Sequence, residues 1–138
     1  LHTINFYSHG TQVTAAHGHL AFYGAYVMIN FAIMTYAFPN LRNTRPYNQM
    51  LNMWSFWIMT SAMAFMTFTL TFAGVVQTHL QRVLGMSYMD IQDQLAFFYW
   101  LRLGAGVVVV IAAVMFVWSI LVPQRESVPA RTATHPAE

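Results

Sequence analysis

The sequence predicts an all-α membrane protein with three spanning helices. Of its 138 residues, 57% are hydrophobic and only 7% are charged, whereas soluble domains carry about 25% charged residues. The apolar residues form three long segments separated by short polar stretches, at about 13–38, 49–84 and 94–122. As an α-helix, each segment is longer than the ~30 Å hydrocarbon core of a bilayer.

The first predicted helix, 13–38, contains no Asp, Glu, Lys or Arg. Its length of ~39 Å is enough to cross a membrane with some tilt. We expect Pro39 to end it, because proline removes a helical hydrogen bond. Residues 1–12 mix polar and aromatic side chains. We interpret them as an interfacial segment, with a turn at 9–11 leading into the helix.

The second predicted helix, 49–84, would be ~52 Å long, which exceeds the thickness of the membrane. We therefore expect its end to project into the aqueous phase or to bend near Gly74. The helix carries a run of Met and Phe residues, which we interpret as packing rather than as metal ligands, because methionine is a soft gap-filling side chain. This run consists of Met59, Met63, Phe65, Met66, Phe68 and Phe72.

The third predicted helix, 94–122, follows a loop at 85–94 that contains two aspartates. Arg102 lies in the first turns of this helix. A buried arginine is costly in a membrane, so Arg102 should snorkel outward, pair with an acid such as Asp93, or bind an anionic group such as a cofactor propionate. Residues 123–138 are rich in Pro, Ala, Thr and charge, and are predicted to be a disordered tail.

The composition excludes several kinds of site. The chain has no cysteine, which excludes disulfides, thiolate metal sites and covalent haem attachment within it. A net charge of +2 is too small to indicate nucleic-acid binding. The first residue is leucine rather than methionine, and we expect the chain to be the C-terminal piece of a longer polypeptide.

The arginines predict the orientation in the membrane. The first loop, near residues 39–46, holds two arginines and no acid, and the tail holds two more. The second loop region combines Arg82 with two aspartates. Because positive charge favours the cytoplasmic side, the first loop and the tail are predicted to be cytoplasmic. The N-terminal segment and the start of the first helix then face the periplasm of a bacterium.

Two histidines one glycine apart, His17 and His19, lie near the head of the first predicted helix. Residues two apart in an α-helix are separated by roughly 200° around its axis. The two imidazoles therefore point to nearly opposite sides and cannot bind one metal ion together. This geometry suits two haems, each taking one axial imidazole from the same helix. Each histidine could instead be a hydrogen-bonded packing residue or a side chain at the membrane surface.

A third histidine, His9, is predicted to lie in the turn that precedes this helix. It could contact a haem propionate or simply face water. The remaining histidines lie at the far end of the second helix or in the terminal segments. None of them is positioned to complete a second metal site with His17 or His19.

Three stretches of the sequence carry a resemblance to a known family. They are SHGTQVTAAHGHLAFYGAY at 8–26, FAGVVQTHLQR at 72–82 and QDQLAFFYWLR at 92–102. The first resembles the tenth helix of the haem–copper oxidase superfamily, and all three resemble the large, cytochrome b subunit of bacterial nitric oxide reductases. The resemblance covers nearly the whole chain up to residue 122. It implies that residues 1–122 form the last three helices of a twelve-helix bundle.

The resemblance also implies cofactors and a reaction. His17 would be the axial ligand of a high-spin haem b at the catalytic centre, and His19 an axial ligand of a low-spin haem b that supplies electrons. Such enzymes of denitrifying respiratory chains reduce two nitric oxide molecules to nitrous oxide and water with two electrons and two protons. The second low-spin ligand and a non-haem iron site of three histidines and a glutamate belong to earlier helices. The present chain alone is therefore not expected to be active.

The resemblance implies partners and a location as well. The expected partners are the rest of the catalytic subunit, a membrane-anchored cytochrome c subunit and nitric oxide, in the bacterial inner membrane. Direct quinol oxidation is the alternative electron source. An oxygen-reducing member of the same superfamily would use the same histidine pair, so that alternative stays open. Outside the superfamily, the alternatives are a non-catalytic three-helix membrane protein and a small dihaem electron carrier.

Overall fold

The computed structural model describes residues 2–42 and 47–122. The predicted disordered tail, 123–138, lies outside the described residues. Within the described part, the chain forms helices joined by short turns. Three of the helical stretches are long and apolar enough to cross a membrane: Gln12–Phe38, Gln49–Val83 and Gln92–Leu121. The prediction of an all-α membrane fold with three spans is confirmed.

The first span is a composite of three helical segments. A short helix, α1 (His2–Ser8), precedes it in the segment that was predicted to be interfacial. A turn with Gly10 at a φ of 75° then leads into α2 (Gln12–Ala21). The span continues as a π-helical segment, η1 (Phe22–Val27), and as α3 (Met28–Arg42).

The prediction that Pro39 ends the first helix is wrong, because α3 continues to Arg42. The φ of proline is compatible with a helix, although the residue lacks an N–H and its ring crowds the preceding turn. Pro39 lies in the last turn of α3, and three residues follow it in the helix. The stretch apolar enough to span a membrane nevertheless ends at Phe38, one residue before the proline.

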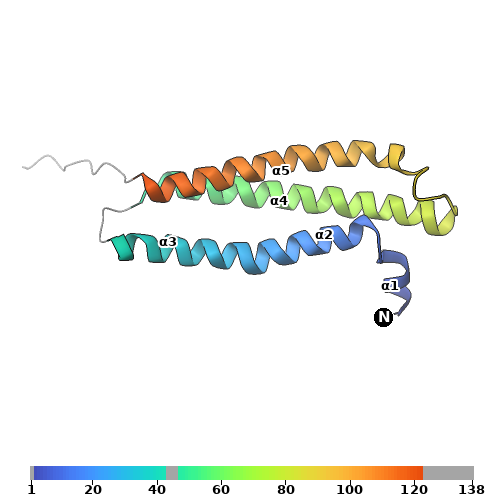
Figure 1. Cartoon of the computed structure of the whole chain (residues 1–138), viewed down its shortest axis with the longest axis horizontal. Coiled ribbons are helices and arrows are strands. Elements are labelled where there is room, and N and C mark those ends of the chain that lie inside the picture. The colour runs from blue at the N-terminus through green and yellow to red at the C-terminus, as the bar shows by residue number, and fades with distance from the viewer. Residues whose placement is uncertain (1, 43–46, 123–138) are drawn as a thin grey trace, which may run out of the picture.

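The second span, α4 (Gln49–Thr78), begins with a side-chain cap in which Asn48 Oδ1 accepts from the backbone N–H of Leu51 at 3.1 Å. It passes through Gly74 without a break and ends in a π-helical turn, η2 (His79–Val83). The end of this span extends beyond its neighbours (Figure 1). The alternative of a bend near Gly74 is therefore wrong, and the projection of this end into the aqueous phase stays a prediction.

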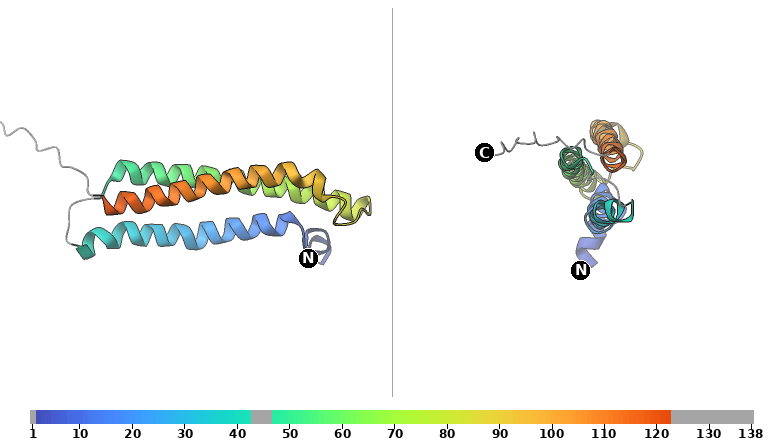
Figure 2. Two further views of the ribbon diagram at one scale, coloured as in Figure 1. Left: turned by 45° about the horizontal axis from the view of Figure 1, so that its top comes forward. Right: turned by 90° about the vertical axis from the view of Figure 1, so that its left-hand side faces the viewer.

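The third span, α5 (Gln92–Leu121), runs back alongside α4. The three spans lie side by side along their length, and α4 packs against both the first span and α5 (Figures 1 and 2). The first span contacts α5 much less, which leaves grooves between them.

The core lies along α4, where methionines and small residues fill the contacts with both neighbours. Met59, Met63 and Met66 are buried there, as the packing interpretation predicted, while the phenylalanines of the same run point outward.

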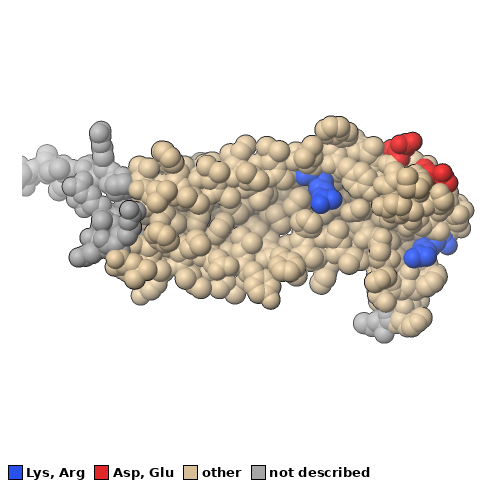
Figure 3. Space-filling view, viewed as in Figure 1, with Lys and Arg blue, Asp and Glu red and all other residues tan. Residues whose placement is uncertain are grey.

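On the face seen in Figure 3, charged side chains gather at the end formed by the α4–α5 connection, and the long flank is uncharged apart from one basic group. An uncharged flank of this length is what a lipid or protein environment within a bilayer requires.

Candidate functional site

His17 and His19 lie on opposite faces of α2, as the spacing predicted. The side chain of His17 is exposed on the outer face of the described part. The side chain of His19 is half-buried and faces two grooves between the first span and its neighbours. One rigid helix therefore presents one imidazole to each side.

The ring of His19 is fixed by a hydrogen bond within its own helix. Its Nδ1 lies 2.7 Å from the carbonyl oxygen of Ala15, one turn earlier. Because a carbonyl only accepts, Nδ1 is the donor in this contact, and in a neutral imidazole Nε2 is then left with a free lone pair. A neutral imidazole held in this tautomer has the donor atom that a haem iron takes as an axial ligand.

The face of α2 that carries His19 also carries the residues that bury the helix. Gln12, Ala16, His19 and Tyr23 follow one another at helical spacing, and Ala16 and Tyr23 are buried against the rest of the bundle. The hydroxyl of Tyr23 lies 3.0 Å from Oγ1 of Thr60 on α4. His19 is thus oriented by the packing of the whole stripe and not by its own contacts alone.

The first groove at His19 has a volume of about 860 Å³ and is mainly apolar. Its polar side chains include His19, Tyr99 and Arg102. The structure therefore brings together two of the predicted site residues that are 83 positions apart in the sequence. Arg102 is nine residues from Asp93 on the same helix, or about 13 Å along its axis, which is too far for the ion pair considered from the sequence.

The second groove at His19 has a volume of about 720 Å³ and lies between η1, α4 and α5. Ala15 and Gly18 line it on the α2 side. These small residues leave room beside the imidazole for a flat, apolar group. Together, the two grooves supply an imidazole nitrogen, an apolar wall and a guanidinium, which fits a haem with its anionic propionates.

His9 is not brought to these grooves. It is exposed in the turn between α1 and α2 and lines neither of them. Within residues 2–42 and 47–122, no three His, Asp or Glu side chains gather into a metal-binding group. The described part of the chain thus offers single imidazoles and no multidentate metal site.

A cluster of glutamines and a tyrosine was missed by sequence reasoning. Gln77 on α4 accepts a hydrogen bond from the backbone N–H of Gln12 at 2.9 Å. The side-chain amide of Gln12 reaches the Tyr99 hydroxyl at 3.4 Å, and that hydroxyl donates to Gln92 at 3.1 Å. These residues join all three spans next to the His19 groove. Glutamines at the ends of apolar helices, Gln12, Gln77 and Gln92, were the available signal, because a buried amide in an apolar environment needs partners.

The π-helical segment η1 was also missed. It begins three residues after His19 and widens the turn on which Tyr23 lies. Such segments are common at functional sites. Neither a proline nor a run of glycines marks it in the sequence, so no local pattern predicts it.

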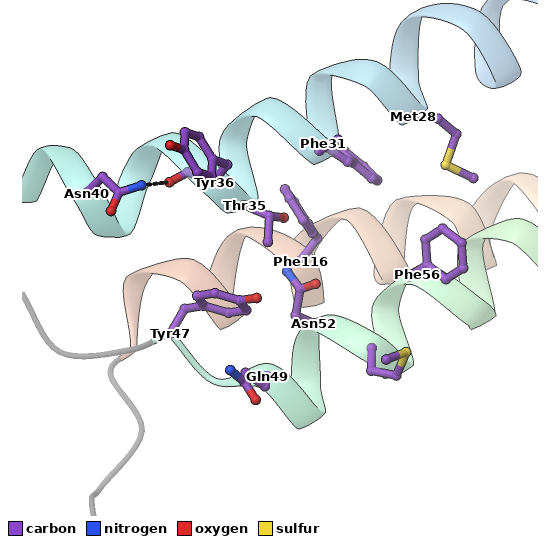
Figure 4. A pocket seen from close by; sticks show the side chains of 12 residues that line it. Met28, Phe31, Thr35, Tyr36, Asn40, Tyr47, Gln49, Asn52, Phe56 and Phe116 are labelled. Atoms are coloured by element: carbon purple, nitrogen blue, oxygen red, sulfur yellow. Dashed lines mark hydrogen bonds between the residues drawn. The ribbon is translucent and has the colours of Figure 1, made fainter.

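A further groove lies at the opposite end of the bundle, between α3 and the start of α4, with a volume of about 830 Å³ (Figure 4). Neutral polar side chains such as Asn40, Tyr47 and Asn52 share its wall with Phe31 and Phe116. Among the described side chains that line it there is no histidine and no charged group. These side chains therefore include no imidazole comparable to that of His19.

Comparison with known proteins assigns the chain to a class. The profile of the family described as cytochrome c and quinol oxidase polypeptide I matches residues 1–108. The chain belongs to this family of helical membrane oxidoreductases.

Within it, the chain is similar to a nitric oxide reductase subunit from Stutzerimonas stutzeri, with 47% identity over 138 residues. The match covers 94% of this chain and 29% of the relative, so the chain spans less than a third of that protein's length.

Proposed function

We propose that the chain is the C-terminal part of the catalytic subunit of a respiratory nitric oxide reductase. The observation that carries the proposal is the placement of His17 and His19 on opposite faces of one helix, in a chain 47% identical to a nitric oxide reductase subunit. The reaction of the complete protein would be 2 NO + 2 e⁻ + 2 H⁺ → N₂O + H₂O. The present residues contribute haem ligands to it, and the non-haem iron ligands lie outside them.

In this proposal His19 ligates a low-spin haem b and His17 ligates a high-spin haem b. The hydrogen bond from Nδ1 of His19 to Ala15 holds the ring in the tautomer with a free Nε2. Arg102, in the same groove, provides positive charge for a propionate. When bound, the two haems supply electron transfer and a binding site for nitric oxide. One rigid helix keeps the two ligands at a constant separation.

The proposed location is the bacterial inner membrane, with the α2 end of the first span towards the periplasm. The arginine-rich first loop and tail support this orientation. Electrons would then arrive on the periplasmic side from a membrane-anchored cytochrome c subunit, which is the proposed partner. The rest of the catalytic subunit would cover the exposed face that carries His17.

The test is to replace each histidine by alanine in the full-length subunit. We predict that His19→Ala removes the low-spin haem signal from optical and electron paramagnetic resonance (EPR) spectra and leaves the high-spin signal. His17→Ala should do the reverse. Replacement of His79, which is exposed in η2 outside both grooves, is the matched control and should change neither signal.

Two outcomes would contradict the assignment of one histidine to each haem. If either His17→Ala or His19→Ala removed both haems from protein that remains folded, the proposal of one ligand for each haem would fail. If neither substitution changed the haem content, the chain would be a membrane segment without a haem-ligating role.

Oxygen reduction is the second candidate, because the matching family profile is described by oxidases. The histidine pair is common to both reactions and does not separate them. Consumption of nitric oxide and of oxygen by the same purified enzyme does so directly. Faster turnover of oxygen than of nitric oxide would favour the oxidase.

A further inference from the structure

We infer that Gln77 and Gly74 of α4 are positioning residues that set the height and rotation of α2 and thereby hold His19 in its groove. This inference rests on the proposed role of His19 as a haem ligand. It concerns two residues that contact no part of the grooves themselves. Their effect on the site passes through the N-terminal turn of α2.

The first turn of α2 depends on another helix for its capping. The first four N–H groups of any helix have no partner within it. The N-cap residue Thr11 makes no side-chain cap, because its hydroxyl donates to the carbonyl oxygen of Ser8 at 2.7 Å. Gln77 supplies the missing acceptor from α4, at 2.9 Å from the backbone nitrogen of Gln12. The cap of α2 is therefore an interhelical hydrogen bond.

Gln77 is well suited to hold a fixed position. Its side chain is only 1% exposed, and its amide nitrogen donates to Gln81 at 3.4 Å. A buried amide without partners is costly in an apolar surrounding. The contact with α2 is thus made by a side chain with little freedom to move.

Gly74, one turn before Gln77, brings the backbones of the two helices into contact. A Cβ atom at this position would overlap the backbone nitrogen of Val13 and lie 2.5 Å from its Cγ2. It would also lie 3.0 Å from the carbonyl carbon of Gln12. Only glycine permits this approach, and the approach brings Gln77 within reach of the Gln12 N–H.

The constraint at Gln12 reaches His19 through the helix. His19 follows Gln12 by seven positions. Seven positions of an α-helix correspond to a rotation about 20° short of two full turns and a rise of ~10 Å along the axis. Gln12 and His19 therefore lie on the same face of α2. The side-chain amide of Gln12 reaches the Tyr99 hydroxyl at 3.4 Å, and His19 and Tyr99 line the same groove. A rotation or shift of α2 at its first turn is transmitted to the imidazole of His19.

The experiment compares Gln77→Met, which keeps the volume but removes the acceptor, with Gln77→Glu, which keeps an acceptor oxygen. Both are made in the full-length enzyme. The readouts are the EPR g-values of the low-spin haem, which report the orientation of its imidazole ligands, together with its midpoint potential and haem content. Thr78→Val is the matched control, because Thr78 lies next to Gln77 but its hydroxyl bonds to no atom of α2. Its partners are the carbonyl oxygens of Tyr7 in α1, at 3.2 Å, and of Gly74 in its own helix, at 2.8 Å.

We expect Gln77→Met to shift the g-values and the potential while the haem content stays that of the parent enzyme. Gln77→Glu should restore the parent spectrum, and Thr78→Val should leave it unchanged. If Gln77→Met leaves both readouts unchanged, or if Thr78→Val changes them equally, the inference is overturned. If His19→Ala retains the low-spin signal, the proposed function itself has failed, and this outcome is separate from the first two.

Discussion

The two ends of the bundle hold the first span in different ways. At the end with His17 and His19, the backbones of α2 and α4 touch at Gly74, and hydrogen bonds between glutamine and tyrosine side chains join three helices. At the other end, α3 meets α5 through a stack of Phe31 on Phe116, with ring centroids 4.1 Å apart. A groove separates α3 from the start of α4 there (Figure 4).

Polar contacts exist at that second end, but they join different helices. The backbone N–H of Asn48 donates to the Ser119 carbonyl at 3.0 Å, and the Asn52 amide donates to the Ser119 hydroxyl at 3.2 Å. Both bonds tie α4 to α5 and leave α3 held by apolar packing. The directional contacts of the first span are thus concentrated at the end that carries His17 and His19.

The largest effect should come from breaking the close approach of α2 and α4. We predict that Gly74→Ala lowers the free energy of unfolding by about 3 kcal/mol, because a methyl group placed against backbone atoms overpacks the contact. Gly104→Ala in α5 is the control, since a Cβ there meets nothing within 4 Å. It should be neutral or stabilising by about 0.5–1 kcal/mol. Unfolding in detergent measures the free energy of unfolding of both variants. Equal losses would contradict the inference that, of the two glycines, only Gly74 lies in a close contact between two helices.

A smaller effect is expected at the opposite end. We predict that Phe116→Ala costs about 1–3 kcal/mol, because it removes the stack on Phe31 and leaves a cavity. The cost is at the lower end of core substitutions, since lipid chains are as apolar as the protein interior. The same unfolding measurement applies, together with the low-spin EPR spectrum. Because Phe31 also lines the second groove at His19, a shift of that spectrum would show that the position of the Phe31 ring affects this groove.

The smallest effect concerns charge within the histidine end. We predict that Arg102→Gln lowers the midpoint potential of the low-spin haem, because loss of a nearby positive charge favours the oxidised state. The expected change is about 1 kcal/mol, or roughly 45 mV for one electron. Arg82→Gln is the control: this guanidinium lies over the Phe6 ring at 5.2 Å, outside the His19 grooves. Redox titration measures the midpoint potential of both variants. Equal shifts would contradict the placement of Arg102 at the proposed haem site.

Much of the fold followed from the sequence because the bilayer imposes long apolar segments. The predicted helices at 49–84 and 94–122 end within two residues of the observed spans. The opposed faces of His17 and His19 followed from helical geometry alone. The predicted end of the first helix at Pro39 was wrong, because a proline near the end of a helix does not have to terminate it.

The parts of the site that depend on contacts between helices could not be predicted. Arg102 lines the groove of His19, which is 83 positions earlier in the sequence. Gln77 caps α2 at Gln12, which is 65 positions earlier. Helical periodicity assigns a face to each residue but not the neighbouring helix that this face meets. The π-helical turns likewise reflect backbone hydrogen bonding that residue types alone do not specify.

The segment η1 has a consequence for which residues of the first span face inward. A π-helical turn contains one more residue than an α-helical turn, so it acts as a phase shift of about 100° between α2 and α3. Met28 and Phe31 of α3 pack against the core with this offset from the buried stripe of α2. In an uninterrupted α-helix the same two residues would be rotated by about 100° away from that position.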